Sequence, residues 1–147
     1  MLCVVSEAGS QHELIDVASG SVLVSGSAAS VGQFAQAYGH QIVETENVCK
    51  APQPGTGQRL LQQGFHPTDF SMAGGDNMAY FWKGKGLADS YALHYGDGIL
   101  EVMVPKDVYR ARLQRHEQLY QGGPHVELPV PHADFGVLNG AIRRWHR

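Results

Sequence analysis

Short apolar stretches separated by glycine-rich turns cover most of the chain, a pattern typical of a strand-rich domain. The strongest strand signal is the run of β-branched and other apolar side chains at residues 98–105, which ends at Pro105. The other predicted strands are residues 21–25, 48–51, 79–82 and 126–131.

Apolar residues spaced three or four positions apart predict several short helices. The predicted helices are residues 29–38, 58–63, 87–95, 107–116 and 135–145. Gly64 follows the second of these helices as a glycine commonly does, and Asp107 is a candidate N-cap for the fourth. Strands and helices in this order predict an α+β fold.

The length of 147 residues, 43% of them hydrophobic, fits one domain with one core. Residues 1–46 differ from the rest, because they are rich in serine, glycine, alanine and valine and carry little charge. We therefore expect a single domain over residues 1–147, in which residues 1–46 form a layer packed on the rest.

Net charge and residue types narrow the classes of function. A net charge of −3 argues against a protein that binds nucleic acid mainly by neutralising phosphates. The two cysteines, Cys3 and Cys49, are too few for a disulfide scaffold, and the eight histidines lack zinc-site spacing, so we expect no metal. We expect neither a membrane span nor a signal peptide, since no apolar run is long enough.

Tyr80 and Tyr91 are the first candidates for a binding site. They are separated by eleven residues, one on a predicted strand and the other on the following predicted helix, so both rings could reach one cleft. Two tyrosines can hold a planar group such as nicotinamide by stacking. Packing of both rings in the core is the alternative.

The residues around these tyrosines resemble a known family. Met78-Ala79-Tyr80-Phe81, a helix with Tyr91, and then Gly98-Ile99-Leu100-Glu101-Val102 resemble the nicotinamide-binding core of His-Tyr-Glu ADP-ribosyltransferases, which include the poly-ADP-ribose polymerases. The segment from Ile99 to Phe135 is also similar to C-terminal toxin domains of bacterial polymorphic (Rhs-type) toxins. The resemblance covers residues 47–140 and implies an ADP-ribosyltransferase-like split β-sheet core with short helices.

The family resemblance implies that NAD is the substrate and that Glu127 is the catalytic carboxylate. Transfer of ADP-ribose passes through an oxocarbenium-like transition state, which a carboxylate beside the ribose stabilises. Glu127 lies on the predicted strand 126–131, where the family carries its catalytic glutamate. A solvent-facing glutamate on an edge strand is the alternative.

The family also implies which residues bind NAD. These are Lys50, Ala51, Arg59, Tyr80, Phe81 and Tyr91. Lys50 and Ala51 occupy the positions of the family's first motif, where the family has histidine or arginine followed by glycine. Lysine meets a phosphate as a point charge without the bidentate fork of arginine, so either Lys50 or Arg59 is expected to hold the ribose-phosphate side.

The expected function is that of an antibacterial toxin domain, secreted or delivered by a secretion system into the target-cell cytoplasm. Its partners would be a macromolecular acceptor, in the translation machinery or another essential target, and a cognate immunity protein. The acidic net charge favours a protein acceptor over RNA. Two alternatives stay open: an inactive binding module with the same fold, and a ribonuclease that uses His125 or His132 as general acid or base.

Overall fold

The structure is a computed structural model that describes residues 1–8, 11–70, 78–83 and 98–146. Its contacts divide the chain into two compact units, Met1–Thr45 and Glu46–Arg147. Sequence analysis predicts a single domain over residues 1–147; in the structure, each of the two units has its own sheet and its own buried cluster. The fold is mixed α+β, with several short helices.

The first unit is a four-stranded sheet with one helix. Its elements are β1 (Leu2–Ala8), β2 (Gln11–Asp16), β3 (Val22–Gly26), α1 (Ala28–Ala37) and β4 (Gln41–Ile42), and the strand order is β3-β2-β1-β4. The Ser27 side chain caps α1 by accepting a hydrogen bond from the backbone of Ser30. Val31 and Ala35 of α1 are buried against Cys3 and Leu14, which attaches the helix to the sheet.

The second unit is built on a six-stranded sheet. Its strands are β5 (Thr45–Lys50), β6 (Met78–Lys83), β7 (Ile99–Pro105), β8 (Gln118–Leu119), β9 (Val126–Pro131) and β10 (Ile142–His146). Their order is β10-β7-β5-β6-β9-β8. The pairs β5 with β6, β6 with β9, β8 with β9, and β7 with β10 are antiparallel.

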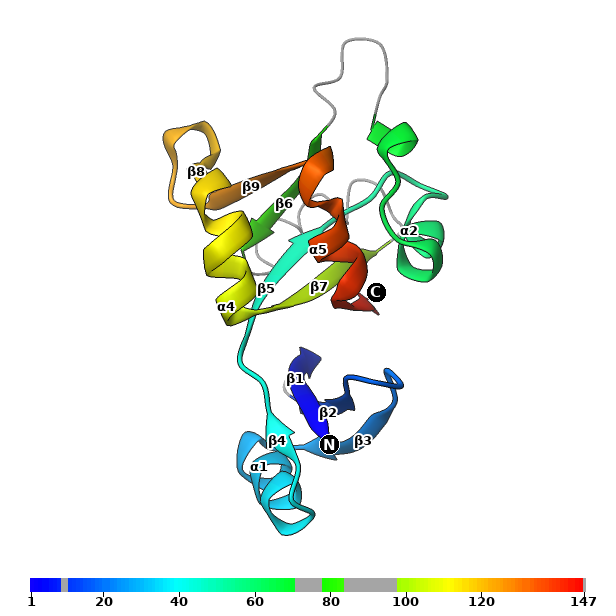
Figure 1. Cartoon of the computed structure of the whole chain (residues 1–147), viewed down its shortest axis with the longest axis vertical. Helices are drawn as coiled ribbons and strands as arrows, with labels where there is room; N and C mark the ends of the chain where they lie inside the picture. The colour runs from blue at the N-terminus through cyan, green and yellow to red at the C-terminus, as the bar shows by residue number, and fades with distance from the viewer. Residues whose placement is uncertain (9–10, 71–77, 84–97, 147) are drawn as a thin grey trace. The chain divides into compact units, whose positions relative to one another are not determined.

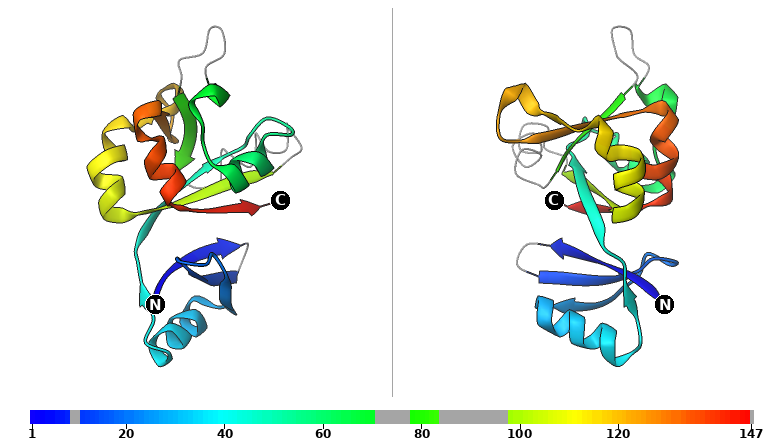
Figure 2. Two further views of the ribbon diagram at one scale, coloured as in Figure 1. Left: turned by 45° about the vertical axis from the view of Figure 1, so that its right-hand side comes forward. Right: turned by 60° about the vertical axis from the view of Figure 1, so that its left-hand side comes forward.

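Helices cover the first face of this sheet, and the apolar core lies between (Figures 1 and 2). The helical elements of this unit are α2 (Gly57–Gln63), η1 (Pro67–Phe70), α4 (Lys106–Val108), η2 (Tyr109–Leu113), η3 (Gln114–His116), η4 (Tyr120–Gly122), η5 (His132–Asp134) and α5 (Phe135–Gly140). Of these, η4 does not cover the first face, because its Tyr120 ring contacts Trp82 of the second face. Side chains alternate between the two faces of a strand, so the buried Val102 and Leu128 identify the first face. The strand positions that alternate with the buried ones form the second face. It carries Asn47, Cys49, Tyr80, Trp82, Glu101, Glu127, Arg144 and His146.

A charged network lies beneath η2 on the first face. The Nζ atom of Lys83 lies 3.0 Å from Glu117 and 3.7 Å from Glu46, and the Tyr109 hydroxyl donates to Glu117 across 2.7 Å. Burial and this hydrogen bond raise the pKa of Tyr109 well above its usual value. Burial alone would lower the pKa of Lys83, but Glu117 and Glu46 raise it. The network fixes η2 and η3 to the sheet.

The five predicted strands are confirmed, as are the helices at 29–38 and 58–63. The helix predicted at 107–116 is a continuous helical segment, Lys106 to His116, whose middle turn η2 is a π-helix. The helix predicted at 135–145 is confirmed from Phe135 to Gly140, where α5 ends, and is wrong beyond it, because the following residues form β10. The helix predicted at 87–95 lies outside the described residues.

Charge is divided unequally between the units. All eleven lysines and arginines lie in Glu46–Arg147, which also has ten acidic residues and a net charge of +1. Met1–Thr45 has four acidic residues and no lysine or arginine, a net charge of −4. The negative net charge of the chain therefore comes from the first unit. Within the described ranges, no helix has the length and apolar character needed to cross a membrane.

Candidate functional site

Tyr80 and Glu127 lie on the second face of neighbouring strands. Tyr80 of β6 is opposite Pro129 of β9, and Glu127 of β9 is opposite Trp82 of β6. Such diagonal neighbours in an antiparallel pair are separated by ~7 to 8 Å. The structure thus brings together two of the residues that the sequence predicts for the NAD site.

A residue of the edge strand β8 orients the carboxylate of Glu127. Gln118 of β8 donates a hydrogen bond from Nε2 to Oε2 of Glu127 across 3.0 Å. Glu127 is half-buried, and its other oxygen, Oε1, forms no hydrogen bond with the described residues. One oxygen is therefore oriented by Gln118.

Trp82 is the direct cross-strand neighbour of Glu127. Its side chain is almost fully buried, and its ring meets Tyr120 edge-on at a centroid distance of 6.0 Å. In the register of the sheet it lies between Cys49 of β5 and Glu127 of β9. Sequence analysis placed Trp82 on a strand but assigned it no role, because nothing in the spacing distinguishes it from a core aromatic residue.

Lys50 does not join this pair. It follows Cys49 on β5 and so points to the first face, where its Nζ atom lies 5.6 Å from the ring centroid of Phe70. Its hydrogen bond goes to the backbone oxygen of Tyr80, across 3.4 Å. Burial lowers the pKa of Lys50 to about 8. Ala51, the next expected contact, is buried.

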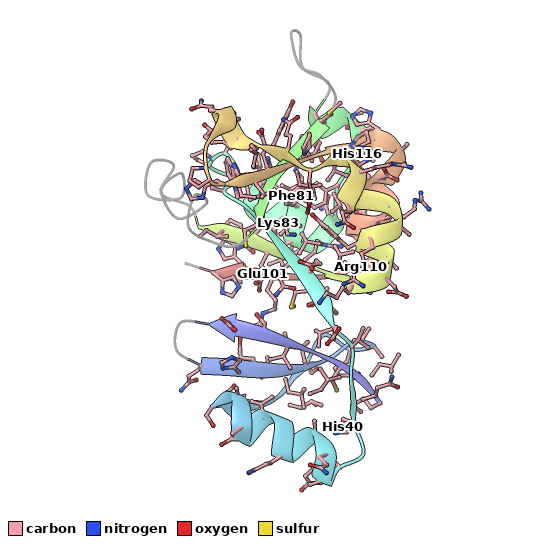
Figure 3. The ribbon with its side chains drawn as sticks, turned by 90° about the vertical axis from the view of Figure 1, so that its left-hand side faces the viewer. His40, Phe81, Lys83, Glu101, Arg110 and His116 are labelled. Atoms are coloured by element: carbon pink, nitrogen blue, oxygen red, sulfur yellow. The ribbon has the colours of Figure 1, made fainter. Side chains whose placement is uncertain are left out.

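Arg59 and Phe81 are also placed away from the second face. Arg59 lies on α2, which covers the first face, and forms an ion pair with Asp69. Phe81 is fully buried and packs against Phe65 at a centroid distance of 5.5 Å. The sequence predicts that Phe81 contacts NAD, and the structure places its side chain in the core on the first face (Figure 3). Tyr91 lies outside the described residues.

The second face carries a buried polar cluster that sequence analysis missed. Glu101 of β7 is 3% exposed, and its Oε1 atom lies 3.0 Å from Nε2 of His146 on β10. Its Oε2 atom accepts a hydrogen bond from Asn47 of β5 across 3.5 Å. Figure 3 shows Glu101 on this side of the sheet. The signal was a single glutamate inside an otherwise apolar strand, which must be paired when buried.

The ribonuclease candidates His125 and His132 are not arranged as an acid–base pair. His125 is exposed, and its backbone oxygen accepts a hydrogen bond from Tyr120 across 2.8 Å. The ring of His132 packs against Phe135 at a centroid distance of 5.0 Å. Neither imidazole contacts a carboxylate among the residues that are described.

Within the described ranges, no three histidine, cysteine, aspartate or glutamate side chains are placed together to hold a metal ion. Comparison of the chain with protein-family models, with curated proteins and with solved structures gives no match. The case for function therefore depends on the residues themselves.

Proposed function

We propose that the unit Glu46–Arg147 is an NAD-dependent ADP-ribosyltransferase of the His-Tyr-Glu type, with an ADP-ribosyltransferase-like core, that modifies a macromolecule. The observation that carries the proposal is the position of Tyr80 and Glu127 on one face of adjacent strands. An aromatic ring and a carboxylate at this separation match what the reaction requires, a surface for nicotinamide and a negative charge beside the ribose.

In this proposal the Glu127 carboxylate acts at the ribose. The bond between ribose C1′ and the nicotinamide nitrogen breaks, nicotinamide leaves with the bonding electrons, and a nucleophile of the acceptor bonds to C1′. The free oxygen of Glu127 stabilises the positive charge that develops on the ribose and accepts the proton that the nucleophile loses. Gln118, which holds the other oxygen, is a positioning residue.

The position of Lys50 favours a second candidate, an inactive binding module. Neither Lys50 nor Arg59 lies on the face that carries Tyr80 and Glu127, so the expected cation for the ribose-phosphate side is not supplied by either. A site that contacts the nicotinamide ring but not the phosphates of NAD would bind NAD or nicotinamide without catalysing transfer.

A labelling experiment with matched variants tests both candidates. The full chain, Glu127→Gln, and the control Glu44→Gln, an exposed glutamate of the first unit, are each incubated with cell lysate and NAD labelled on the adenine. The transferase predicts labelled protein or RNA and released nicotinamide from the wild type and from Glu44→Gln but not from Glu127→Gln. Calorimetric titration with NAD and with nicotinamide identifies the binding module, which binds without labelling.

Absence of both labelling and NAD binding would contradict both candidates. Cleavage of lysate RNA without NAD would instead identify the ribonuclease. For the toxin role, induced expression in bacterial cytoplasm is expected to stop growth with the wild type and not with Glu127→Gln. A cognate immunity protein would then be recognised as a protein whose co-expression restores growth.

A further inference from the structure

In the second unit, one buried carboxylate contacts three basic side chains. Asp134, at the end of η5, has a side chain only 3% exposed. Its Oδ1 atom lies 3.1 Å from Nη2 of Arg112, and its Oδ2 atom lies 3.0 Å from Nε2 of His116 and 3.8 Å from Nη2 of Arg115. We call these four residues the Asp134 cluster.

Asp134 neutralises only part of the charge that surrounds it. Burial alone would raise the pKa of Asp134, but the hydrogen bonds from His116 and Arg112 lower it, so the carboxylate stays ionised at neutral pH. One negative charge faces two guanidinium groups and an imidazole. Arg112 and His116 each hydrogen-bond one carboxylate oxygen, and Arg115, at 3.8 Å, adds a second guanidinium charge that a single carboxylate does not neutralise.

The donors that remain are directed outward. The side chains of Arg112 and Arg115 are 54% and 66% exposed, and each guanidinium has several N–H groups beyond those that reach Asp134. The ring nitrogen of His116 that faces away from Asp134, Nδ1, forms no hydrogen bond within the part of the chain that the structure describes. The buried carboxylate holds these groups in place before any ligand arrives.

Three other basic residues of this unit already have partners. Arg59 pairs with Asp69, and Lys83 pairs with Glu46 and Glu117. Arg143 donates to the backbone oxygens of Leu61, Leu138 and Asn139. The excess positive charge of the Asp134 cluster is thus a local feature of a unit whose net charge is only +1.

We propose that the Asp134 cluster is a binding site for a phosphate group, carried by a nucleotide or by the backbone of a nucleic acid. Each of the two guanidinium groups offers several N–H donors, and the imidazole adds one more in its protonated form. These donors match a tetrahedral anion that presents three non-ester oxygens in a mononucleotide or two non-bridging oxygens in a phosphodiester. A carboxylate presents only two coplanar oxygens and leaves donors unused. The site includes the helical turn after a π-helix, a distortion that is frequent at functional sites.

Arg110 provides a matched control for the test. It is exposed, lies on the same helical segment and forms no ion pair with any described residue. The buried Tyr109 and Leu113 separate its flank of the helix from the flank of Arg112. Arg110 and His116 lie toward opposite ends of the segment in Figure 3. Arg110→Gln removes the same charge as Arg115→Gln without touching the cluster.

The first arm titrates the full chain with inorganic phosphate and with adenosine 5′-monophosphate, against chloride at matched ionic strength, and follows arginine and histidine side-chain signals by NMR. Saturable shifts at Arg112, Arg115 and His116 are expected with both phosphates. Arg115→Gln should weaken this binding about tenfold, while Arg110→Gln should leave it unchanged. Phosphate that acts no differently from chloride overturns the proposal, as does equal behaviour of the two variants.

The second arm identifies the source of the phosphate by fluorescence anisotropy with short single-stranded RNA and DNA. A nucleic-acid site predicts tighter binding than to the mononucleotide. It also predicts that the slope of log affinity against log salt becomes shallower by about 0.7 in Arg115→Gln, because one cation no longer neutralises a phosphate. A mononucleotide site predicts neither effect. Polyglutamate that competes as well as RNA would show a general acidic surface site and overturn the assignment to phosphate.

The outcome of both arms is independent of NAD turnover. Failure of the phosphate site is therefore distinguishable from failure of the proposed transferase.

Discussion

The ammonium group of Lys50 donates a hydrogen bond to the backbone oxygen of Tyr80, across 3.4 Å, from the opposite face of the sheet to the one that carries the Tyr80 ring. No carboxylate lies within ion-pair distance of this ammonium group among the described residues. A buried lysine without a counter-charge lowers stability, because the charged form loses its hydration.

Replacing Lys50 by methionine should therefore stabilise the protein at pH 7. The pKa of Lys50 is lowered from 10.5 to about 8 by burial, so the folded state releases the proton before the unfolded state does. The free energy of unfolding of the wild type should rise between pH 8 and pH 10.5 and carry the full penalty below pH 8. The penalty is at most roughly 3 kcal/mol, at 1.36 kcal/mol for each pKa unit.

Urea denaturation at several pH values measures this effect. Lys50→Met should remove the rise seen in the wild type. Lys83→Met is the control, since it leaves Glu46 and Glu117 without their shared cation and should lower stability at pH 7. If Lys50→Met destabilises the protein as Lys83→Met does, the lysine is favourably paired and the prediction is wrong.

Tyr80 should contribute its ring, and not its hydroxyl, to NAD binding. Tyr80→Ala is expected to raise the KM for NAD about tenfold with a smaller change in kcat, because stacking is lost equally from ground state and transition state. Tyr80→Phe keeps the ring and should behave as the wild type. Steady-state nicotinamide release provides both kcat and KM. Equal KM values for the alanine and phenylalanine variants would show that the Tyr80 ring does not contact NAD.

Asn139 joins α5 to the segment after α2 by two hydrogen bonds to one residue. Its Oδ1 atom accepts from the backbone nitrogen of Phe65 across 2.6 Å, and its Nδ2 atom donates to the backbone oxygen of Phe65 across 2.9 Å. Asn139→Ala should cost about 2 to 3 kcal/mol, because both backbone groups lose their partner in a half-buried site. Chemical denaturation of Asn139→Ala and of Asn139→Asp, which keeps only the acceptor, should rank the aspartate variant between alanine and wild type.

Gly57 allows α2 to approach β10. A Cβ atom at this position would lie 2.1 Å from the ring of Trp145, so Gly57→Ala should push the indole away and destabilise the unit by about 1 to 3 kcal/mol. Thermal unfolding monitored by tryptophan fluorescence measures the cost. The double variant Gly57→Ala/Trp145→Leu should cost less than the sum of the two single changes, and strict additivity would show that the two residues do not touch.

The strands were predictable where local pattern and final environment agree. Residues 126–131 alternate because Leu128 and Val130 face the core, and residues 99–105 are apolar except for Glu101 because both faces are buried. The final segment was mistaken for a helix because its apolar spacing fits one. The low helix propensity of Gly136, Asn139 and Gly140 destabilises a longer helix. The residues beyond Ala141 instead form backbone hydrogen bonds with β7 as strand β10.

The candidate site was predictable only in part, because its members meet through strand register. Tyr80 and Glu127 share a face since β6 and β9 pair as they do, and Lys50 lies on the other face by a single step of the same alternation. The Asp134 cluster joins residues up to 22 positions apart through two helical turns. No local pattern in the sequence contains that contact.

The unequal distribution of charge also determines which reagents can report on each unit. Met1–Thr45 contains no side-chain amine and no guanidinium, so lysine-directed cross-linkers and acylating probes will mark side chains of the second unit alone. Trypsin, which cleaves after lysine and arginine, finds its first site at Lys50, beyond the boundary between the units. A tryptic digest will thus release the whole first unit as one peptide, and Lys50, buried in the folded chain, will be cut only when β5 opens.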